Sequence, residues 1–190
     1  GFDVLGFSIE GLGDEIIIHK SDLKGVRINN IFGHNVPLKA KENTATVAAQ
    51  SLLDYLNVDQ GFDIEINKNI KPGSGIGSSA ASAVGAVYGI NKILGNPLKK
   101  EQLLKFAMKG EFISSKTAPA DNVASALYGG LILVNNRENY NVVKLPVPKD
   151  LLAVVHHPLI EIKTSISRSV LPKTIDINLA SQQLASMGGF

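Results

Sequence analysis

The residues best suited to chemistry in this 190-residue chain lie in one run, PGSGIGSSAA, at positions 72–81. Three glycines within five positions leave backbone N–H groups uncovered by side chains and allow positive φ angles. Ser78 and Ser79 then open a helix pattern, and a helix N-terminus attracts an anion through its free N–H groups and its dipole. The run therefore predicts a phosphate-binding loop; the alternative is a tight strand-to-helix turn without a ligand.

Two common phosphate-binding motifs do not match this run. A Walker A motif needs a lysine directly after its last glycine, and Ser78 stands there. A Rossmann fingerprint needs glycine at the position of Ser78, and also an acidic residue about 20 positions later, which is missing. The loop therefore belongs to another class of phosphate site.

The run resembles the Pro-x-x-x-Gly-Leu-Gly-Ser-Ser-Ala signature of the kinases that act on galactose, homoserine, mevalonate and phosphomevalonate. Ile76 stands where these kinases usually have Leu or Met, which exchanges one apolar side chain for another. The resemblance implies ATP as the cofactor and a loop that holds its β- and γ-phosphates. The residues it assigns to ATP are Pro72, Gly73, Ser74, Gly75, Ile76, Gly77, Ser78, Ser79, Ala80 and Ala81.

Three further segments are similar to homoserine kinases in particular. GFDVLG at 1–6 is similar to their first motif, ADNVA at 120–124 to their His-x-Asp-Asn-Val-Ala-Pro segment, and IKTSISR at 162–168 to their Lys-Thr-Ser-x-x-Arg. The four segments keep the family's order along the chain. Two positions depart from the pattern, because Pro119 replaces a histidine and Ser125 replaces a proline.

The resemblance implies that ATP phosphorylates the side-chain hydroxyl of L-homoserine, giving O-phospho-L-homoserine in threonine biosynthesis. Asp3 and Arg168 have opposite charges, which match the ammonium and carboxylate groups of an amino acid. Thr164 belongs to the same substrate-binding segment as Arg168. The alternatives are a mevalonate-type kinase of the same superfamily and a non-catalytic nucleotide-binding fragment.

Magnesium is the second cofactor that the resemblance implies. Its ligands would be Ser78 or Ser79, with Ser79 the residue we choose, and the carboxylate of Glu111. Oxygen ligands of this kind suit Mg²⁺, which usually keeps several waters. The other interpretations are a helix N-cap for the serines and a solvated carboxylate near a helix end for Glu111.

Two neighbouring residues are candidates at the reacting hydroxyl. Asn122 could orient the hydroxyl, whereas Asp121 could act as a general base, as in mevalonate kinases. Homoserine kinases are thought to work without a strong base. Spacing alone does not decide between Asp121 and Asn122, so both are kept as catalytic candidates.

Composition narrows the class of protein. The chain is 44% hydrophobic and 19% charged with a net charge of +2, and its basic residues are scattered, so we expect a small-molecule substrate and no nucleic-acid or membrane partner. The chain has no cysteine, which excludes disulfides, zinc ribbons and thiol catalysis within it. The absence suits a reducing compartment, and we expect a cytoplasmic enzyme; a homodimer is left open.

Strand and helix patterns alternate irregularly, which favours an α+β fold. Gly85 and Gly89 lie one turn apart inside an expected helix, where glycine is unfavourable, and so predict close packing at that face. Asn43 or Thr44 is expected to cap the first helix. We expect strands at 15–19, 26–31, 62–67, 131–134, 142–146 and 151–157, and helices at 44–56, 78–94, 100–108, 122–127, 165–171 and 177–187.

The segment PVPK at 146–149 is the one convincing linker. The resemblance implies a nucleotide-binding domain at 1–146 that is like domain 2 of ribosomal protein S5. It implies the beginning of a ferredoxin-like domain at 150–190. Chains of the family are longer at both ends, so we expect this chain to be truncated on each side.

Overall fold

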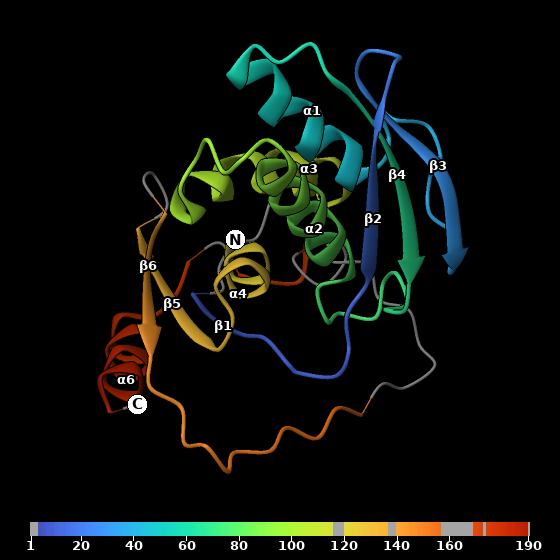
Figure 1. Ribbon diagram of the computed structural model, residues 1–190. Coiled ribbons are helices and arrows are strands. Elements are labelled where there is room, and N and C mark those ends of the chain that lie inside the picture. The colour runs from blue at the N-terminus through green and yellow to red at the C-terminus, as the bar shows by residue number, and fades with distance from the viewer. Residues whose placement is uncertain (1–3, 116–119, 137–139, 157–168, 173, 190) are drawn as a thin grey trace.

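The structure is a computed structural model that describes residues 4–115, 120–136, 140–156, 169–172 and 174–189. The described residues form two three-stranded sheets and a group of helices (Figure 1). The strands are β1 (Leu5–Phe7), β2 (Glu15–Ser21), β3 (Val26–Gly33), β4 (Gly61–Lys68), β5 (Leu131–Asn136) and β6 (Asn141–Leu145). The helices are α1 (Thr44–Leu56), α2 (Ser78–Ile93), α3 (Lys100–Ser115), α4 (Ala120–Tyr128) and α6 (Ile177–Gly188).

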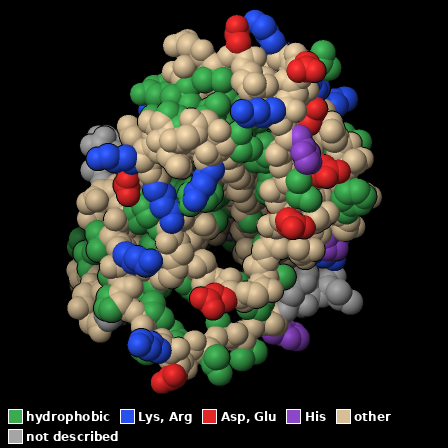
Figure 2. Space-filling model, viewed as in Figure 1, with side chains coloured by type: hydrophobic (Ala, Val, Ile, Leu, Met, Phe, Trp, Pro, Cys, Tyr) green, Lys and Arg blue, Asp and Glu red, His purple; other side chains and the backbone are tan. Residues whose placement is uncertain are grey.

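The first sheet has the strand order β2-β4-β3, with β2 antiparallel and β3 parallel to the central strand. Side chains of β4 alternate between the two faces, as in any strand. Phe62, Ile64 and Ile66 are buried on the inner face, and Asp63 and Glu65 lie on the outer face. Acidic and histidine side chains accordingly gather on the side of the molecule where this sheet lies (Figure 2).

Helices α1, α2 and α3 pack against one another, and α1 and α2 also contact the first sheet. Asn43 caps α1, since its Oδ1 accepts a hydrogen bond of 2.9 Å from the N–H of Ala45, as expected. A Cβ atom on Gly85 or Gly89 of α2 would lie 2.6 or 2.5 Å from an isoleucine side chain of β2. The expected close packing is confirmed, and the neighbours are the side chains Ile16 and Ile18.

The second sheet has the order β1-β5-β6 with both pairs antiparallel, and α4 packs on β1 and β5. As expected, β6 is an edge strand, because its sheet order ends there. The sequence did not predict β1, which is only three residues long. Its Gly6 permits the close approach to α4, since a Cβ there would lie 2.8 Å from the carbonyl oxygen of Asp121.

Helix α3 is longer than expected and continues to Ser115. Gly110 does not end it. A Cβ at Gly110 would lie 2.3 Å from the carbonyl oxygen of Thr44, so glycine is required where α3 crosses the start of α1. The expected end of this helix at residue 108 is therefore wrong.

The chain after β6 differs most from expectation. Residues 151–156 form no strand, although their apolar pattern predicts one, and Leu152 and Val154 are exposed. A strand needs a neighbour for its backbone hydrogen bonds, and the described residues offer 151–156 none. Helix α6 forms as expected, with Asp176 as its N-cap and no buried side chain. The helix expected at 165–171 lies mostly outside the described residues.

No helix among the described residues is long and apolar enough to cross a membrane.

Candidate functional site

The glycine loop has the backbone conformation that its sequence predicts. Gly73, Gly75 and Gly77 have φ angles of 75°, 81° and 78°, in the left-handed region that favours glycine. A Cβ at Gly75 would meet nothing within 4 Å, so side chains leave this part of the loop uncovered. A Cβ at Gly77 would meet only Asn122, at 3.9 Å. The loop is therefore open on the side that faces α4.

The start of α2 presents backbone donors beside this loop. The N-cap residue is Gly77, which makes no side-chain capping bond, and the first turn holds no acidic residue. The alternative interpretation of the serines as N-caps is therefore wrong: Ser78 is inside the helix, and its Oγ donates a 2.9 Å hydrogen bond to the carbonyl oxygen of Ile70. In the described part of the chain, Ser74 Oγ is buried without a hydrogen-bond partner. Such a site suits an anion.

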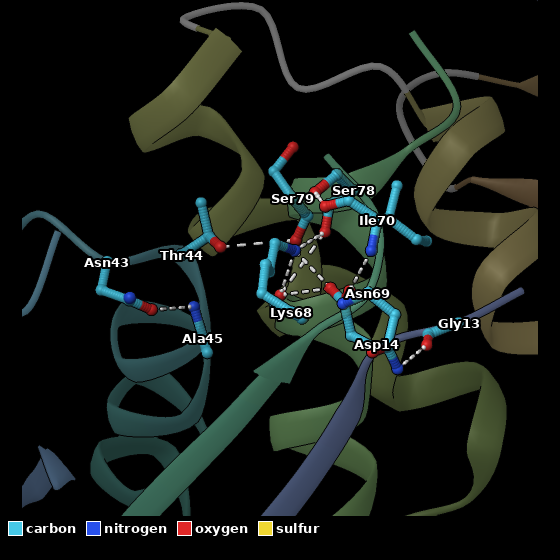
Figure 3. A network of polar contacts seen from close by, with 11 residues as sticks. Gly13, Asp14, Asn43, Thr44, Ala45, Lys68, Asn69, Ile70, Ser78 and Ser79 are labelled. Atoms are coloured by element: carbon cyan, nitrogen blue, oxygen red, sulfur yellow. Dashed lines mark hydrogen bonds and ion pairs between the residues drawn. The ribbon is translucent and has the colours of Figure 1, made fainter. Parts of the chain in front are cut away.

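A buried lysine lies beneath the loop (Figure 3). The alternation of β4 places Lys68 on the inner face, after Phe62, Ile64 and Ile66, and its side chain is only 2% exposed. Lys68 Nζ donates to the carbonyl oxygen of Ser78 at 2.6 Å and to Ser82 Oγ at 2.8 Å.

Asp14 is the ionic partner of Lys68, and its side chain is fully buried. Asp14 Oδ1 also accepts hydrogen bonds from the backbone N–H groups of Asn69 at 3.1 Å and Ile70 at 3.0 Å. Ser82 Oγ donates to Asp14 Oδ2 at 2.9 Å. Burial lowers the pKa of Lys68, while the hydrogen bond and charge of Asp14 oppose that shift.

Sequence reasoning missed both members of this pair. A signal for Lys68 was available, because a lysine at the fourth inward position of an apolar strand must be buried and paired. No comparable signal existed for Asp14, which lies 54 positions away in the sequence, just before β2.

Ser79 and Glu111, the expected magnesium ligands, lie together. Glu111 on α3 is 4% exposed. Its carboxylate accepts a hydrogen bond of 3.3 Å from Ser114 Oγ and also interacts with the Ser79 hydroxyl. The interpretation of Glu111 as a solvated carboxylate is therefore wrong. Thr44 Oγ1 donates to the carbonyl oxygen of Ser79 at 3.4 Å, which ties this pair to the start of α1.

Burial is the main cause that raises the pKa of Glu111. Hydrogen bonds from Ser79 and Ser114 and the charge of Lys68 oppose the shift, and the charge of Asp121 adds to it. No group of three or more His, Cys, Asp or Glu side chains that could hold a metal occurs among the described residues. A cation held by Ser79 and Glu111 would therefore need further ligands from phosphate and water, which is common for Mg²⁺.

Asp121 and Asn122, the candidates at the reacting hydroxyl, lie in the first turn of α4. Both line a cavity of about 740 Å³ together with Gly75 and Gly77 of the glycine loop. The other walls come from the segment 5–14, the middle of α2 and the rest of α4. Asp121 is 7% exposed, whereas Asn122 is half-buried and lies next to Gly77. Figure 2 shows a hollow in the lower half of the molecule.

The three residues expected to bind the substrate, Asp3, Thr164 and Arg168, lie outside the described residues. Pro119, one of the two departures from the motif pattern, lies outside them as well. The other departure, Ser125, is part of α4, where its Oγ donates to the carbonyl oxygen of Asn122 at 3.1 Å. The structure thus brings Ser79 near Glu111 and places Asp121 and Asn122 beside the glycine loop, and the roles of all these residues stay predictions.

Comparison with known protein families matches residues 43–130 to the GHMP kinases N terminal domain. This stretch runs from the cap of α1 to the end of α4 and includes the glycine loop, Lys68 and Glu111.

Curated relatives extend the similarity to nearly the whole chain. A homoserine kinase of Chlorobium phaeobacteroides is 38% identical over 99% of this chain and 62% of its own length. A homoserine kinase of Methanococcus vannielii is 34% identical over 100% of this chain and 63% of its own length. The chain therefore spans less than two thirds of the length of these relatives.

Solved structures agree with the sequence relatives. The crystal structure of a homoserine kinase from Cytophaga hutchinsonii has a TM-score of 0.90 and 43% identity, covering 100% of this chain and 61% of that one. A mevalonate kinase from Methanococcus jannaschii has a TM-score of 0.55 and 21% identity, covering 72% of this chain and 47% of that one. The second likeness concerns the fold alone.

Proposed function

Because the chain belongs to the GHMP kinases and its relatives are homoserine kinases, we propose that the protein phosphorylates the side-chain hydroxyl of L-homoserine with ATP. The product would be O-phospho-L-homoserine, an intermediate of threonine biosynthesis. The observation that carries this proposal is the 43% identity and TM-score of 0.90 with a solved homoserine kinase over the whole chain. The glycine loop supplies the matching chemistry, since phosphoryl transfer depends mostly on positioning and on charge stabilisation.

The residues of the loop fit the phosphates of ATP. The left-handed glycines and the uncapped start of α2 offer backbone donors, and Ser74 Oγ offers a buried hydroxyl without a partner in the described residues. These groups would hold the β- and γ-phosphates through the ten residues Pro72–Ala81.

Ser79 and Glu111 fit a magnesium ion, because a hydroxyl and a buried carboxylate already meet there. Magnesium bound there would neutralise part of the charge on the phosphates during transfer.

Asn122 is the residue that we assign to the reacting hydroxyl. Both residues line the cavity, but only the Asn122 side chain is next to Gly77 of the loop, whereas Asp121 is buried and its charge acts on Glu111. Replacing Asn122 by Ala and, separately, Asp121 by Asn tests this assignment. Loss of a general base would change the pH profile of the rate, and loss of an orienting amide would lower the rate at every pH.

Substrate recognition would use Asp3 for the ammonium group and Arg168, with Thr164, for the carboxylate. We also propose that residues 1–146 form a domain like domain 2 of ribosomal protein S5 and that 150–190 begin a ferredoxin-like domain. The Pro-rich segment 146–149, after β6, supports that division. The cysteine-free sequence supports a cytoplasmic location. Analytical ultracentrifugation would test for a homodimer.

A coupled ADP-release assay on the natural protein that carries this sequence tests the proposal. Homoserine, mevalonate and galactose are offered at equal concentration with magnesium and ATP. Homoserine should be turned over best, since only it has both the ammonium and the carboxylate that Asp3 and Arg168 would bind. A preference for an alcohol without an amino group would favour the mevalonate-type alternative, and no turnover with any of them would favour a non-catalytic nucleotide binder.

A further inference from the structure

We propose that Lys68 is a positioning residue of the phosphate site, which fixes the start of α2 and thereby the Ser79–Glu111 pair. The inference rests on the proposed function insofar as that pair is taken to hold magnesium. Neither Lys68 nor its partner Asp14 belongs to the glycine loop, so their contribution would be made entirely from beneath it.

The first step of the argument is the bond from Lys68 to the helix start. Lys68 Nζ donates to the carbonyl oxygen of Ser78 at 2.6 Å. That carbonyl belongs to the peptide group whose N–H is on Ser79. In a planar trans peptide the C=O and the N–H point in opposite directions. With the ammonium on its oxygen, this peptide group must point its N–H away from Lys68, in the direction of the glycine loop.

The ammonium also strengthens that N–H as a donor. When the carbonyl oxygen of a peptide group accepts a hydrogen bond from a charged donor, the peptide group is polarised. Its N–H then donates a stronger hydrogen bond. The buried location increases the effect, because the side chain of Lys68 is 2% exposed and so is not screened by water. A donor prepared in this way is suited to a phosphate oxygen.

Asp14 holds the N-terminal end of the loop, where the chain leaves β4. It neutralises Lys68 and accepts from the N–H groups of Asn69 and Ile70. Ser78 Oγ in turn donates to the carbonyl oxygen of Ile70 at 2.9 Å. The strand end and the helix start are therefore bonded to one another and to one ion pair (Figure 3).

The link to the magnesium pair is covalent. Ser79 follows Ser78 directly, and its hydroxyl interacts with the carboxylate of Glu111. A buried ion pair is weak evidence for stability, since apolar residues of similar size often replace such a pair without loss. A positioning role explains better why charges are kept here.

The decisive variant is the double replacement Lys68→Met with Asp14→Asn. It removes both charges of the ion pair together, so that neither partner is left without the other, and it keeps an acceptor for the N–H groups of Asn69 and Ile70. We expect the magnesium concentration for half-maximal activity, and that for half-maximal ATP binding, to rise by about tenfold or more, as for loss of a group that orients a metal ligand. Unchanged magnesium dependence would overturn the proposal.

Two controls separate positioning from general stability. Leu53→Ala removes a core side chain that is 1% exposed near the end of α1, and should lower the melting temperature while leaving magnesium dependence alone. Lys24→Met with Asp59→Asn removes an exposed ion pair of 2.9 Å and should change neither property. If Leu53→Ala raises the magnesium requirement as much as the buried double variant does, the effect is general destabilisation and the proposal is wrong.

A milder variant covers the case in which the double variant does not fold. Ser82→Ala removes the hydroxyl that bonds both Lys68 and Asp14 but leaves both charges in place. The magnesium requirement should rise by about threefold, and a wild-type value would contradict the proposal. If the wild-type protein binds Mg·ATP but does not phosphorylate homoserine, the proposed function fails, and magnesium-dependent ATP binding by the same variants still decides the role of Lys68.

Discussion

Strand β4, which leads into the glycine loop, and the segment after β6 both carry apolar side chains, but their surroundings are very different. Around the loop, the inward side chains of β4 are buried and even the lysine among them is paired with Asp14. In the later segment, Leu152 is 88% and Val154 is 96% exposed, and α6 buries no side chain. An apolar pattern thus becomes a strand or a packed helix only where a partner lies against it.

The same contrast divides the proposed active site. The residues that we propose for phosphate and magnesium are held by contacts among α1, α2, α3 and β4, all within the described residues. The proposed substrate residues Asp3, Thr164 and Arg168 lie outside them. Variants in the first region should therefore alter nucleotide and metal binding even when the proposed substrate residues are unchanged.

Glu111→Gln should have the largest effect. It removes a buried charge that we assign to magnesium, and loss of one such electrostatic group lowers kcat by about 10²- to 10³-fold. Measuring kcat and its magnesium dependence in the ADP-release assay checks this. Glu101→Gln, an exposed carboxylate in the first turn of the same helix, is the control and should behave as wild type. Wild-type magnesium dependence in the Glu111 variant would show that the metal binds elsewhere.

Gly77→Ala should have a smaller effect, and Gly95→Ala is its matched control. Both glycines have left-handed φ angles, 78° and 83°, and at neither would a Cβ meet an atom closer than 3.9 Å. Each substitution should therefore cost about 1–2 kcal/mol of backbone strain.

The two glycine variants should differ in ligand binding. Only the variant at Gly77 should weaken ATP binding, by about tenfold, because relieving 1–2 kcal/mol of strain would reorient the donors at the start of α2. Calorimetric titration with ATP and thermal unfolding of both variants measure the two effects. Equal ATP affinity in the two variants would mean that the loop conformation at Gly77 does not matter for the nucleotide.

Much of the nucleotide region could be predicted from the sequence. The loop, the helices at 44–56 and 78–94 and the meeting of Ser79 with Glu111 rest on strong local signals or on the motif. The ion pair beneath the loop could not be predicted in full, because Asp14 joins it through a tertiary contact. The strand expected at 151–157 was wrong over its described part, 151–156, because hydropathy reports what a segment would bury and not whether a partner is present.

The smallest expected effect is on the pH dependence of stability. The pKa of Glu111 is raised in the folded state above its ordinary 4.5, so its contribution to stability is fully present below that pH. The contribution is lost as the pH rises through the raised value, since the ionised carboxylate is poorly solvated. Each unit of pKa shift corresponds to about 1.4 kcal/mol.

Urea unfolding without magnesium, at pH 4 to 8, tests this linkage. The wild-type protein should lose stability relative to Glu111→Gln as the pH rises from about 4.5, because glutamine does not titrate. Added magnesium and ATP should reduce the difference by stabilising the ionised carboxylate. Parallel stability curves for the two proteins in the absence of magnesium would contradict the assigned burial of Glu111.

The most direct test of the account is a crystal structure of the natural protein with magnesium and a non-hydrolysable ATP analogue. We expect the β- and γ-phosphates against the backbone of residues 73–77 and the first turn of α2, with the metal between Ser79 and Glu111. Lys68 should remain beneath them, bonded to the carbonyl oxygen of Ser78 and to Asp14. A nucleotide bound elsewhere, or a metal that contacts neither Ser79 nor Glu111, would contradict the central claim that this loop and this pair form the phosphoryl-transfer site.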